Sequence, residues 1–193
     1  MLIVDLCGTL VRENTTHGFL HSLPLVPWRK VVVQAALSRV GGAICSRIGV
    51  DARGAILVPV LRGLSRDFLY DRGENYVREV LNRRGNRAVL DSVIAARDVG
   101  TKVILATASL DPIAAAFANA LHLDGVVSTQ LAYGEDGRCL GRIARDTTGT
   151  KLKYVRDLVG DIDRRQFAVY TDNPEDTDLM QAAHKVYFIG DVA

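Results

Sequence analysis

Polar residues adjoin short apolar runs, or open a helical pattern, at widely separated places in the chain. The set comprises Asp5, Thr9, Thr107, Lys151, Asp172 and Asp176. Carboxylates are the hard oxygen ligands that Mg²⁺ prefers, whereas an ammonium group and hydroxyl groups bind phosphate. If the fold brings these residues together, they make a site for magnesium and phosphate. An aspartate in such a site could also act as a nucleophile and form an aspartyl-phosphate.

Most of these residues have an ordinary explanation when each is taken alone. Thr107 could be a hydroxyl at a strand end, Lys151 a solvated helix residue, and Asp176 an acid favoured by the dipole of a helix N-terminus. Asp5 is different because it closes the apolar run "LIV". A buried carboxylate is costly unless it is paired, bound to metal or functional. The ordered set, rather than any single member, therefore predicts chemistry.

The elements that must position these residues alternate between apolar strands and helices. Buried strands are predicted at "LIVDL", "KVILATAS", "QFAVYTD" and "KVYFI", and a hairpin at "GVVSTQLAY" and "RCLGRIA" around the turn "GEDG". Helices are predicted between them, one with Asp111 as its N-cap and Pro112 as its first residue. This alternation is typical of an α/β protein with a parallel sheet covered on both faces. Ligands in such sheets bind beyond the carboxyl ends of the strands.

Residues 12–87 interrupt this alternation. Val33, Leu37, Val40 and Ile44 recur at helical spacing, with no convincing strand in the segment. We therefore expect an all-α insertion after the first strand, which divides the chain into a core domain of residues 1–11 and 88–193 and a helical domain of residues 12–87.

The motifs resemble those of the haloacid dehalogenase (HAD) superfamily of aspartate-nucleophile phosphohydrolases. "IVDLCGTL" is similar to the first motif, which has a hydrophobic run followed by Asp-x-Asp-Gly-Thr-Leu. "VILATAS", "GTK" and "YTDNPED" resemble the second, third and fourth motifs, and together they span the predicted sheet. The resemblance implies a three-layer Rossmann-like fold. The insertion occupies the place of the C1-type helical cap of the phosphoserine-phosphatase-like branch.

Roles for individual residues follow from this resemblance. It implies a magnesium-dependent hydrolase of a phosphorylated small molecule, with Asp5 as nucleophile and Asp172 as a magnesium ligand. Asp176 would be either a second ligand or the group that orients Lys151, and Lys153 competes with Lys151 for the phosphate. The implied catalytic residues are Asp5, Cys7, Thr107 and Lys151; the implied substrate-binding residues are Thr9, Thr107, Ala108 and Lys151; the implied magnesium ligands are Asp5, the backbone carbonyl of Cys7, Asp172 and Asp176.

Cys7 departs from the family pattern, in which a second aspartate protonates the leaving group and later activates water. A thiol is a weaker acid and a weak hydrogen-bond partner, and loss of a general acid/base typically costs about a hundred- to ten-thousand-fold in rate. The protein could hydrolyse acyl phosphates or phosphoanhydrides, whose leaving groups need little protonation, or use an acid from the insertion or from the substrate. It could instead be a phosphotransferase, or a non-catalytic phosphate-binding protein.

Composition excludes some classes of partner and some kinds of site. The net charge of +2 is too balanced to indicate nucleic acid, and three cysteines at wide spacings fit neither a disulfide framework nor a zinc site. The first residues lack the basic segment of a signal peptide, basic residues interrupt every apolar run, and we expect a cytoplasmic location. The oligomeric state is not predicted.

The insertion has an unusual charge distribution. Between Thr15 and Arg66 there are seven Lys or Arg residues and one acid, Asp51, so this stretch carries about +6. Its segment "WRKVVVQAALSRVGGAICSRIGV" is apolar around most of a helix. Such a helix is usually buried, and we expect it to lie in the core of a four-helix cap. A peripheral contact with a membrane, through an interface around Trp28, is the alternative.

Overall fold

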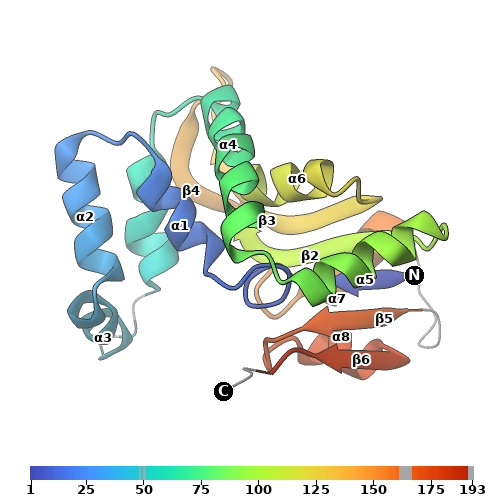
Figure 1. Cartoon of the computed structure of the whole chain (residues 1–193). Helices are drawn as coiled ribbons and strands as arrows, with labels where there is room; N and C mark the ends of the chain where they lie inside the picture. Colours follow the sequence, from blue (N-terminus) through green and yellow to red (C-terminus); the bar gives the residue numbers. More distant parts are fainter. Residues whose placement is uncertain (48, 50, 161–166, 191–193) are drawn as a thin grey trace.

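A six-stranded sheet forms the centre of the computed structural model, which describes residues 1–47, 49, 51–160 and 167–190 (Figure 1). The strand order is β4-β3-β2-β1-β5-β6. All neighbouring pairs are parallel except the β3/β4 hairpin. The strands are β1 (Leu2–Val4), β2 (Val103–Leu110), β3 (Gly125–Tyr133), β4 (Cys139–Arg145), β5 (Ala168–Thr171) and β6 (Lys185–Phe188). The strands and the hairpin predicted from apolar runs are confirmed; residue 166 of one predicted strand lies outside the described part.

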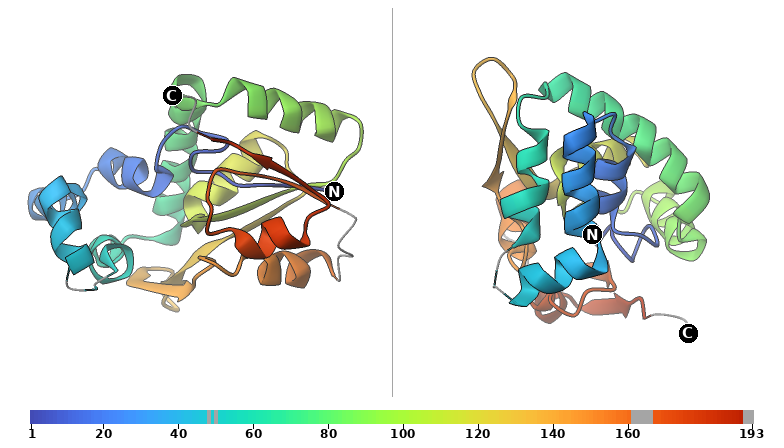
Figure 2. Two further views of the ribbon diagram at one scale, coloured as in Figure 1. Left: turned by 90° about the horizontal axis from the view of Figure 1, so that it is seen from below. Right: turned by 90° about the vertical axis from the view of Figure 1, so that its left-hand side faces the viewer.

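Helices cover both faces of the sheet and make three layers (Figures 1 and 2). The side chains of β1 alternate between the faces: Leu2 and Val4 belong to one hydrophobic cluster, and Ile3 to the other. Helices α4 (Arg66–Arg84), α5 (Arg87–Asp98) and α6 (Asp111–Ala120) contribute to the first cluster, whereas α7 (Lys151–Val159) and α8 (Thr177–Ala182) contribute to the second. The predicted α/β fold with a three-layer, mostly parallel sheet is confirmed.

The start of α6 differs from the prediction. Asp111 is the first residue of the helix, Leu110 is the N-cap residue, and no side chain caps the helix. The Asp111 carboxylate instead accepts hydrogen bonds from the Leu131 backbone N–H and from the Tyr70 hydroxyl. The capping prediction was wrong because a tertiary contact with α4 and β3 uses both carboxylate oxygens.

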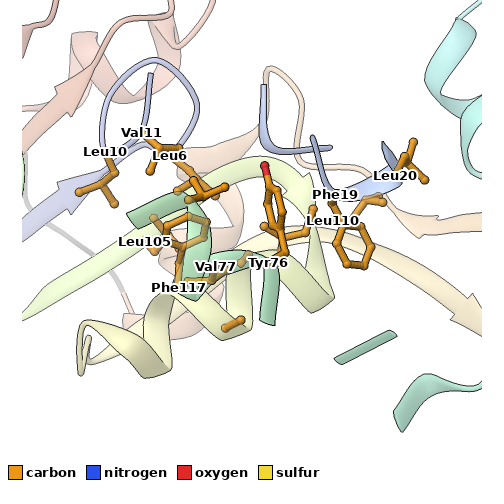
Figure 3. Packing of buried hydrophobic residues seen from close by; sticks show 14 of the residues in the cluster. Leu6, Leu10, Val11, Phe19, Leu20, Tyr76, Val77, Leu105, Leu110 and Phe117 are labelled. Carbon is orange, nitrogen blue, oxygen red and sulfur yellow. The ribbon is translucent and has the colours of Figure 1, made fainter. Parts of the chain in front are cut away.

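The described residues between β1 and β2 form helices, turns and isolated β-bridges, and none of them forms a strand. The additional elements are α1 (Thr15–Ser22), α2 (Pro27–Leu37), α3 (Arg39–Arg47), the π-helical turn η1 (Arg53–Leu57) and the 3₁₀ turn η2 (Pro59–Leu61). The insertion shares its core with the sheet. The rings of Phe19 and Tyr76 pack edge to face with their centroids 5.9 Å apart, and both belong to the cluster that contains Leu105 and Phe117 (Figure 3). The division at residues 11/12 and 87/88 therefore remains a proposal, since one cluster crosses it.

The expected buried helix over residues 28–50 was wrong. Ser38 divides the stretch, because its backbone leaves the helical region at ψ 155° and its hydroxyl accepts a hydrogen bond from the Gly41 N–H, as an N-cap does. Val33, Ala36 and Cys45 are buried, but most other side chains of α2 and α3 are exposed. Residues 48 and 50 of the predicted helix lie outside the described part.

Candidate active site

The side chain of Lys151 lies buried between two carboxylates. Its Nζ donates hydrogen bonds to Asp5 Oδ1 at 2.7 Å and to Asp176 Oδ2 at 2.8 Å. Asp5 follows β1, Asp176 follows β5, and Lys151 is the first residue of α7. β1 and β5 are adjacent and parallel, so their carboxyl ends meet at one edge of the sheet. The topology therefore brings together three residues that are up to 171 positions apart in the chain.

Burial dominates the electrostatics of this group. It raises the pKa of Asp5 to about 6, against the opposing effect of the Lys151 charge. Burial alone would lower the pKa of Lys151, but the charges and hydrogen bonds of Asp5 and Asp176 raise it above its ordinary value. Lys151 thus stays charged at neutral pH. Lys153, the competitor, is exposed and lies over the Tyr154 ring.

Asp176 contacts protein groups on its buried side. Its Oδ2 accepts hydrogen bonds from Lys151 Nζ and, at 2.7 Å, from Thr171 Oγ1. Asp176 does not belong to the lining of the crevice in which Asp5 and Lys151 lie. Of its two predicted roles, these contacts favour the orientation of Lys151 over metal ligation.

Asp172 takes a different position, facing the crevice next to the first motif. Its Oδ1 accepts a 3.0 Å hydrogen bond from Thr9 Oγ1. Gly8 has φ +74°, and a Cβ added there would lie 1.8 Å from Asp172 Oδ2. The absence of a side chain at Gly8 therefore allows this carboxylate to approach the first motif. Thr9 is fully buried and holds Asp172; unlike the prediction for a substrate contact, it is not part of the crevice lining.

Hydroxyl groups surround the Cys7 thiol. Its Sγ lies 3.1 Å from Thr15 Oγ1 and 3.2 Å from Ser109 Oγ, and these two hydroxyls lie 2.7 Å apart. Thr107 Oγ1 extends the cluster by donating to Ser109 Oγ at 3.2 Å. Burial raises the pKa of Cys7, so the thiol is protonated at neutral pH. The group at this position is thus a neutral, weak hydrogen-bond partner rather than a carboxylic acid.

A crevice of about 330 Å³ joins these groups. The predicted residues in its lining are Asp5, Cys7, Thr107, Ala108, Lys151 and Asp172. The insertion adds four residues that the sequence did not single out for this site: Asn14, Thr16, His17 and Arg53. A larger hollow of about 800 Å³ adjoins the crevice across Cys7 and Asp172. The smaller space is the candidate active site, because its lining contains the predicted residues Asp5, Thr107 and Lys151.

Arg53 ties the insertion to the sheet edge. It donates through Nη1 to the Ala108 carbonyl at 3.0 Å, and through Nη2 to Thr148 Oγ1 at 3.0 Å and to the Asp146 carboxylate. Burial would raise the pKa of Asp146, but hydrogen bonds from Thr148 and the Arg53 charge hold it below its usual range. The basic composition of the insertion was the signal that could have found Arg53.

The family of the protein can be stated once this geometry is compared with known proteins. The family model of the haloacid dehalogenase-like hydrolases matches residues 2–181. The chain belongs to this family. The predicted membership is confirmed, and the protein is an HAD-like hydrolase.

Relatives and solved structures agree with this assignment. Protein CicA of Caulobacter vibrioides is 36% identical over 189 residues, which cover 95% of this chain and 82% of the relative. A protein of unknown function from Bordetella pertussis Tohama I has a TM-score of 0.76 at 19% identity, covering 96% of this chain and 87% of that one. An apo phosphoserine phosphatase has a TM-score of 0.63 at 15% identity, covering 98% and 86%. At these identities, the structures show a shared HAD fold.

The crevice of this HAD-like protein fits a divalent cation by charge and by donor type. Asp5 and Asp172 present two carboxylates to the crevice. Asp176, behind Lys151, balances the ammonium charge, and Asp146 balances the charge of Arg53. Carboxylate and carbonyl oxygens are the ligands that Mg²⁺ takes, and it keeps several waters. Within the described residues, no group of three or more His, Cys, Asp or Glu side chains is arranged to hold a metal. A magnesium ion would therefore depend on two carboxylates, a backbone carbonyl and water.

Proposed function

We propose that the protein is a Mg²⁺-dependent phosphohydrolase of a small or amphiphilic phosphorylated substrate, and that it acts through an aspartyl-phosphate on Asp5. The buried Asp5–Lys151–Asp176 arrangement carries this proposal. A carboxylate held by a charged lysine at the end of a crevice is placed to attack an anionic phosphoryl group. Burial of this ion triad is difficult to explain by stability alone, because desolvation of the charges offsets their attraction.

In the first step, a carboxylate oxygen of Asp5 forms a bond to phosphorus while the bond from phosphorus to the leaving oxygen breaks. The Lys151 ammonium and the Thr107 hydroxyl bind the non-bridging phosphoryl oxygens, and the Ala108 backbone lies in the same lining. Asp176 and Thr171 fix the Lys151 side chain through the hydrogen bonds described above. In the second step, water attacks phosphorus, the bond to Asp5 breaks, and inorganic phosphate leaves.

The groups proposed to hold Mg²⁺ are the carboxylates of Asp5 and Asp172 and the backbone carbonyl of Cys7. When bound, the cation supplies charge neutralisation and orientation for the phosphoryl group. Thr9 and Gly8 act indirectly, because the first donates a hydrogen bond to Asp172 and the second leaves space for it.

Cys7 decides which substrates this site favours. Cys7 is half-buried, and desolvation raises the pKa of its thiol, so it can donate a proton only by forming an unfavourable, poorly solvated thiolate. Leaving groups that depart without protonation avoid this cost, so we propose acyl phosphates or phosphoanhydrides as the preferred class. His17 is the alternative source of acid/base chemistry within the insertion. Burial lowers the pKa of His17, which leaves the imidazole neutral at pH 7 and able to accept a proton from water.

A phosphotransferase is the second candidate, and the Cys7 cluster is the observation that favours it. Thr15, Ser109 and Thr107, which surround or extend from this thiol, offer hydroxyls and no carboxylate to activate water. A long-lived aspartyl-phosphate could then pass its phosphoryl group to an alcohol acceptor. A third candidate, a non-catalytic phosphate-binding protein, retains the same contacts to phosphate without turnover.

Phosphate release from acyl phosphates and alkyl phosphomonoesters with Mg²⁺ separates these candidates. We expect Asp5→Asn to abolish release, and Cys7→Asp to raise release from alkyl esters by about a hundredfold or more. Cys7→Ser is the matched control, because it keeps a small polar group without the acid. If wild type turns over neither substrate class and Cys7→Asp restores nothing, simple hydrolysis is wrong. Product analysis with an added alcohol then tests transfer.

A further inference from the structure

Helices α2 and α3 present an exposed surface that combines apolar and basic side chains. We call it the basic apolar face, and it consists of Trp28, Lys30, Val31, Arg39, Val40, Ala43, Ile44 and Arg47. The two helices lie at the end of the molecule away from β6 (Figure 1). The right-hand view of Figure 2 looks onto this end, with α2 and α3 toward the viewer.

The large apolar residues of this face are mostly exposed, although such residues usually lie in the core. Trp28 and Val31 are 61% and 62% exposed, and they lie one turn apart on α2. Val40 and Ile44 are 70% and 54% exposed and lie one turn apart on α3. Large apolar side chains scattered singly on a surface are ordinary, but Val40, Ala43 and Ile44 of α3 line one hollow together, and such a group indicates an interaction site.

Charge complementarity indicates the partner. Lys30, Arg39 and Arg47 are exposed on the face, and no acidic residue occurs between Glu13 and Asp51. Arg39 and Arg47 flank Val40, Ala43 and Ile44 around one shallow hollow. Basic side chains interleaved with Trp and aliphatic residues are typical of a helix that lies in the head-group region of an anionic membrane.

A second copy of the chain and a nucleic acid fit this face less well. In a two-fold symmetric dimer, the same patch meets itself, so the three cations would oppose one another. A nucleic acid would neutralise the cations but would leave the aliphatic side chains of both helices without an apolar partner. An anionic bilayer provides partners for both kinds of side chain. Its phosphates pair with the cations, and its acyl chains surround the apolar side chains.

We propose that the basic apolar face docks the protein onto an anionic phospholipid bilayer as a peripheral contact. Within the described residues, no helix is long and apolar enough to cross a bilayer. The insertion that bears the face also lines the crevice through Arg53, and η1 packs against α2. Docking would thus hold the crevice near the membrane surface. This inference stands apart from the chemistry proposed above, because it concerns residues outside the crevice.

Co-sedimentation with phosphatidylglycerol/phosphatidylcholine vesicles tests the proposal, with pure phosphatidylcholine vesicles for comparison. We expect wild type to bind the anionic vesicles at low ionic strength and to be released by high salt. The face variant carries Lys30→Gln, Arg39→Gln and Arg47→Gln. It should partition roughly 100-fold more weakly, since each basic residue near an anionic surface contributes about fivefold. Arg78→Gln, Arg87→Gln and Lys102→Gln make the matched control, with the same charge change at exposed sites elsewhere.

A second experiment tests whether apolar side chains enter the bilayer. It uses the double variant Val40→Ser, Ile44→Ser and the fluorescence emission of Trp28. We expect this double variant to bind at least tenfold more weakly, and the Trp28 emission of wild type to shift to the blue on anionic vesicles. Asp5→Asn should bind like wild type, so docking can hold even if the hydrolase proposal fails. The proposal is overturned if wild type ignores anionic vesicles or if the control triple loses binding equally. It is also overturned if the Val40/Ile44 variant changes only the oligomeric state in sedimentation velocity.

Discussion

The strand-end crevice and the basic apolar face place charge in opposite ways. In the crevice, Lys151 is buried between Asp5 and Asp176, and each of these three charges has an oppositely charged partner within 2.8 Å. On the face, Lys30, Arg39 and Arg47 are exposed beside apolar side chains, and no acid occurs between Glu13 and Asp51. The first arrangement pairs opposite charges in a crevice, which suits the one small phosphorylated group that we propose for it. The second is open, and it suits an extended partner with many anions.

The difference teaches that sheet topology determines the first arrangement, whereas helix packing determines the second. The crevice follows from the parallel pairing of β1 with β2 and β5, which leaves little freedom to the residues that follow the strands. The exposure of α2 and α3 follows from which elements cover them. Substitutions can therefore test the two regions by different measurements, namely stability with activity in the crevice and partitioning on the face.

Removal of the central cation should give the largest effect. Lys151→Met leaves Asp5 and Asp176 buried without their partner, and we expect unfolding to become easier by about 3–5 kcal/mol at neutral pH. Phosphate release should fall to background. Lys153→Met is the matched control, since Lys153 is exposed two residues away. Denaturant unfolding and phosphate assays on both variants would contradict the assignment of Lys151 if Lys153→Met proved the more damaging.

Metal removal should affect stability in a pH-dependent way. Burial raises the pKa of Asp5 from 3.8 to about 6, so the folded state holds this proton more tightly than the unfolded state. The stabilising contribution of Asp5 is therefore fully present below about pH 4. It is lost as the pH rises from about 4 to about 6, and the unfolding free energy falls by up to about 3 kcal/mol over this range. Mg²⁺ offsets this loss only once Asp5 is ionised.

The expected result is a Tm increase with Mg²⁺ that is small near about pH 5 and large near about pH 7.5. Differential scanning calorimetry with Mg²⁺ or with a chelator measures it. Asp5→Asn should remove most of this pH dependence. A Mg²⁺ effect that is equal at both pH values, or that is unchanged in Asp5→Asn, would remove Asp5 from the proposed metal site.

Gly8→Ala should damage the crevice through geometry. The new Cβ would overlap Asp172 Oδ2 and would also sit at a positive φ. We expect a stability loss of about 2–3 kcal/mol and roughly tenfold weaker binding of Mg²⁺. Gly100→Ala is the control, because Gly100 has φ +77° with no atom near its Cβ position. Equal effects of the two variants on Mg²⁺ titrations would show that backbone strain alone is responsible.

The smallest effects should separate the two sides of α2. Val33 is 1% exposed and Val31 is 62% exposed. Val33→Ala should cost about 1–3 kcal/mol through a cavity, whereas Val31→Ala should stay within about 0.5 kcal/mol. Helix propensity changes equally in the two variants. The difference between their free energies of unfolding in urea therefore measures the effect of burial. Similar losses in the two variants would mean that the exposed side of α2 is packed against something in solution.

The strands and the convergent site were predictable because each signal is local. A short β-branched run ending in Asp5 or Thr107 already indicates a buried strand and a polar strand end. The sequence offered two roles for Asp176 and could not decide between them, and it did not predict the hydrogen bond of Thr9 to Asp172, because both depend on the side-chain rotamers of distant residues. The same is true of Arg53, which reaches the sheet edge from a helical turn. The sequence of residues 28–50 correctly indicated helix and an apolar composition. It could not indicate which neighbouring elements would cover the apolar side chains.

Capture of the intermediate tests the central claim most directly. The protein is mixed with Mg²⁺ and acetyl phosphate that is radiolabelled in its phosphoryl group. The mixture is quenched in acid, and the label bound to the protein is counted. We expect protein-bound label that hydroxylamine removes, that is absent in Asp5→Asn, and that falls in steady state in Cys7→Asp because the restored acid/base speeds hydrolysis. Label that persists in Asp5→Asn, or phosphate release by wild type with no labelled protein, would contradict an aspartyl-phosphate on Asp5.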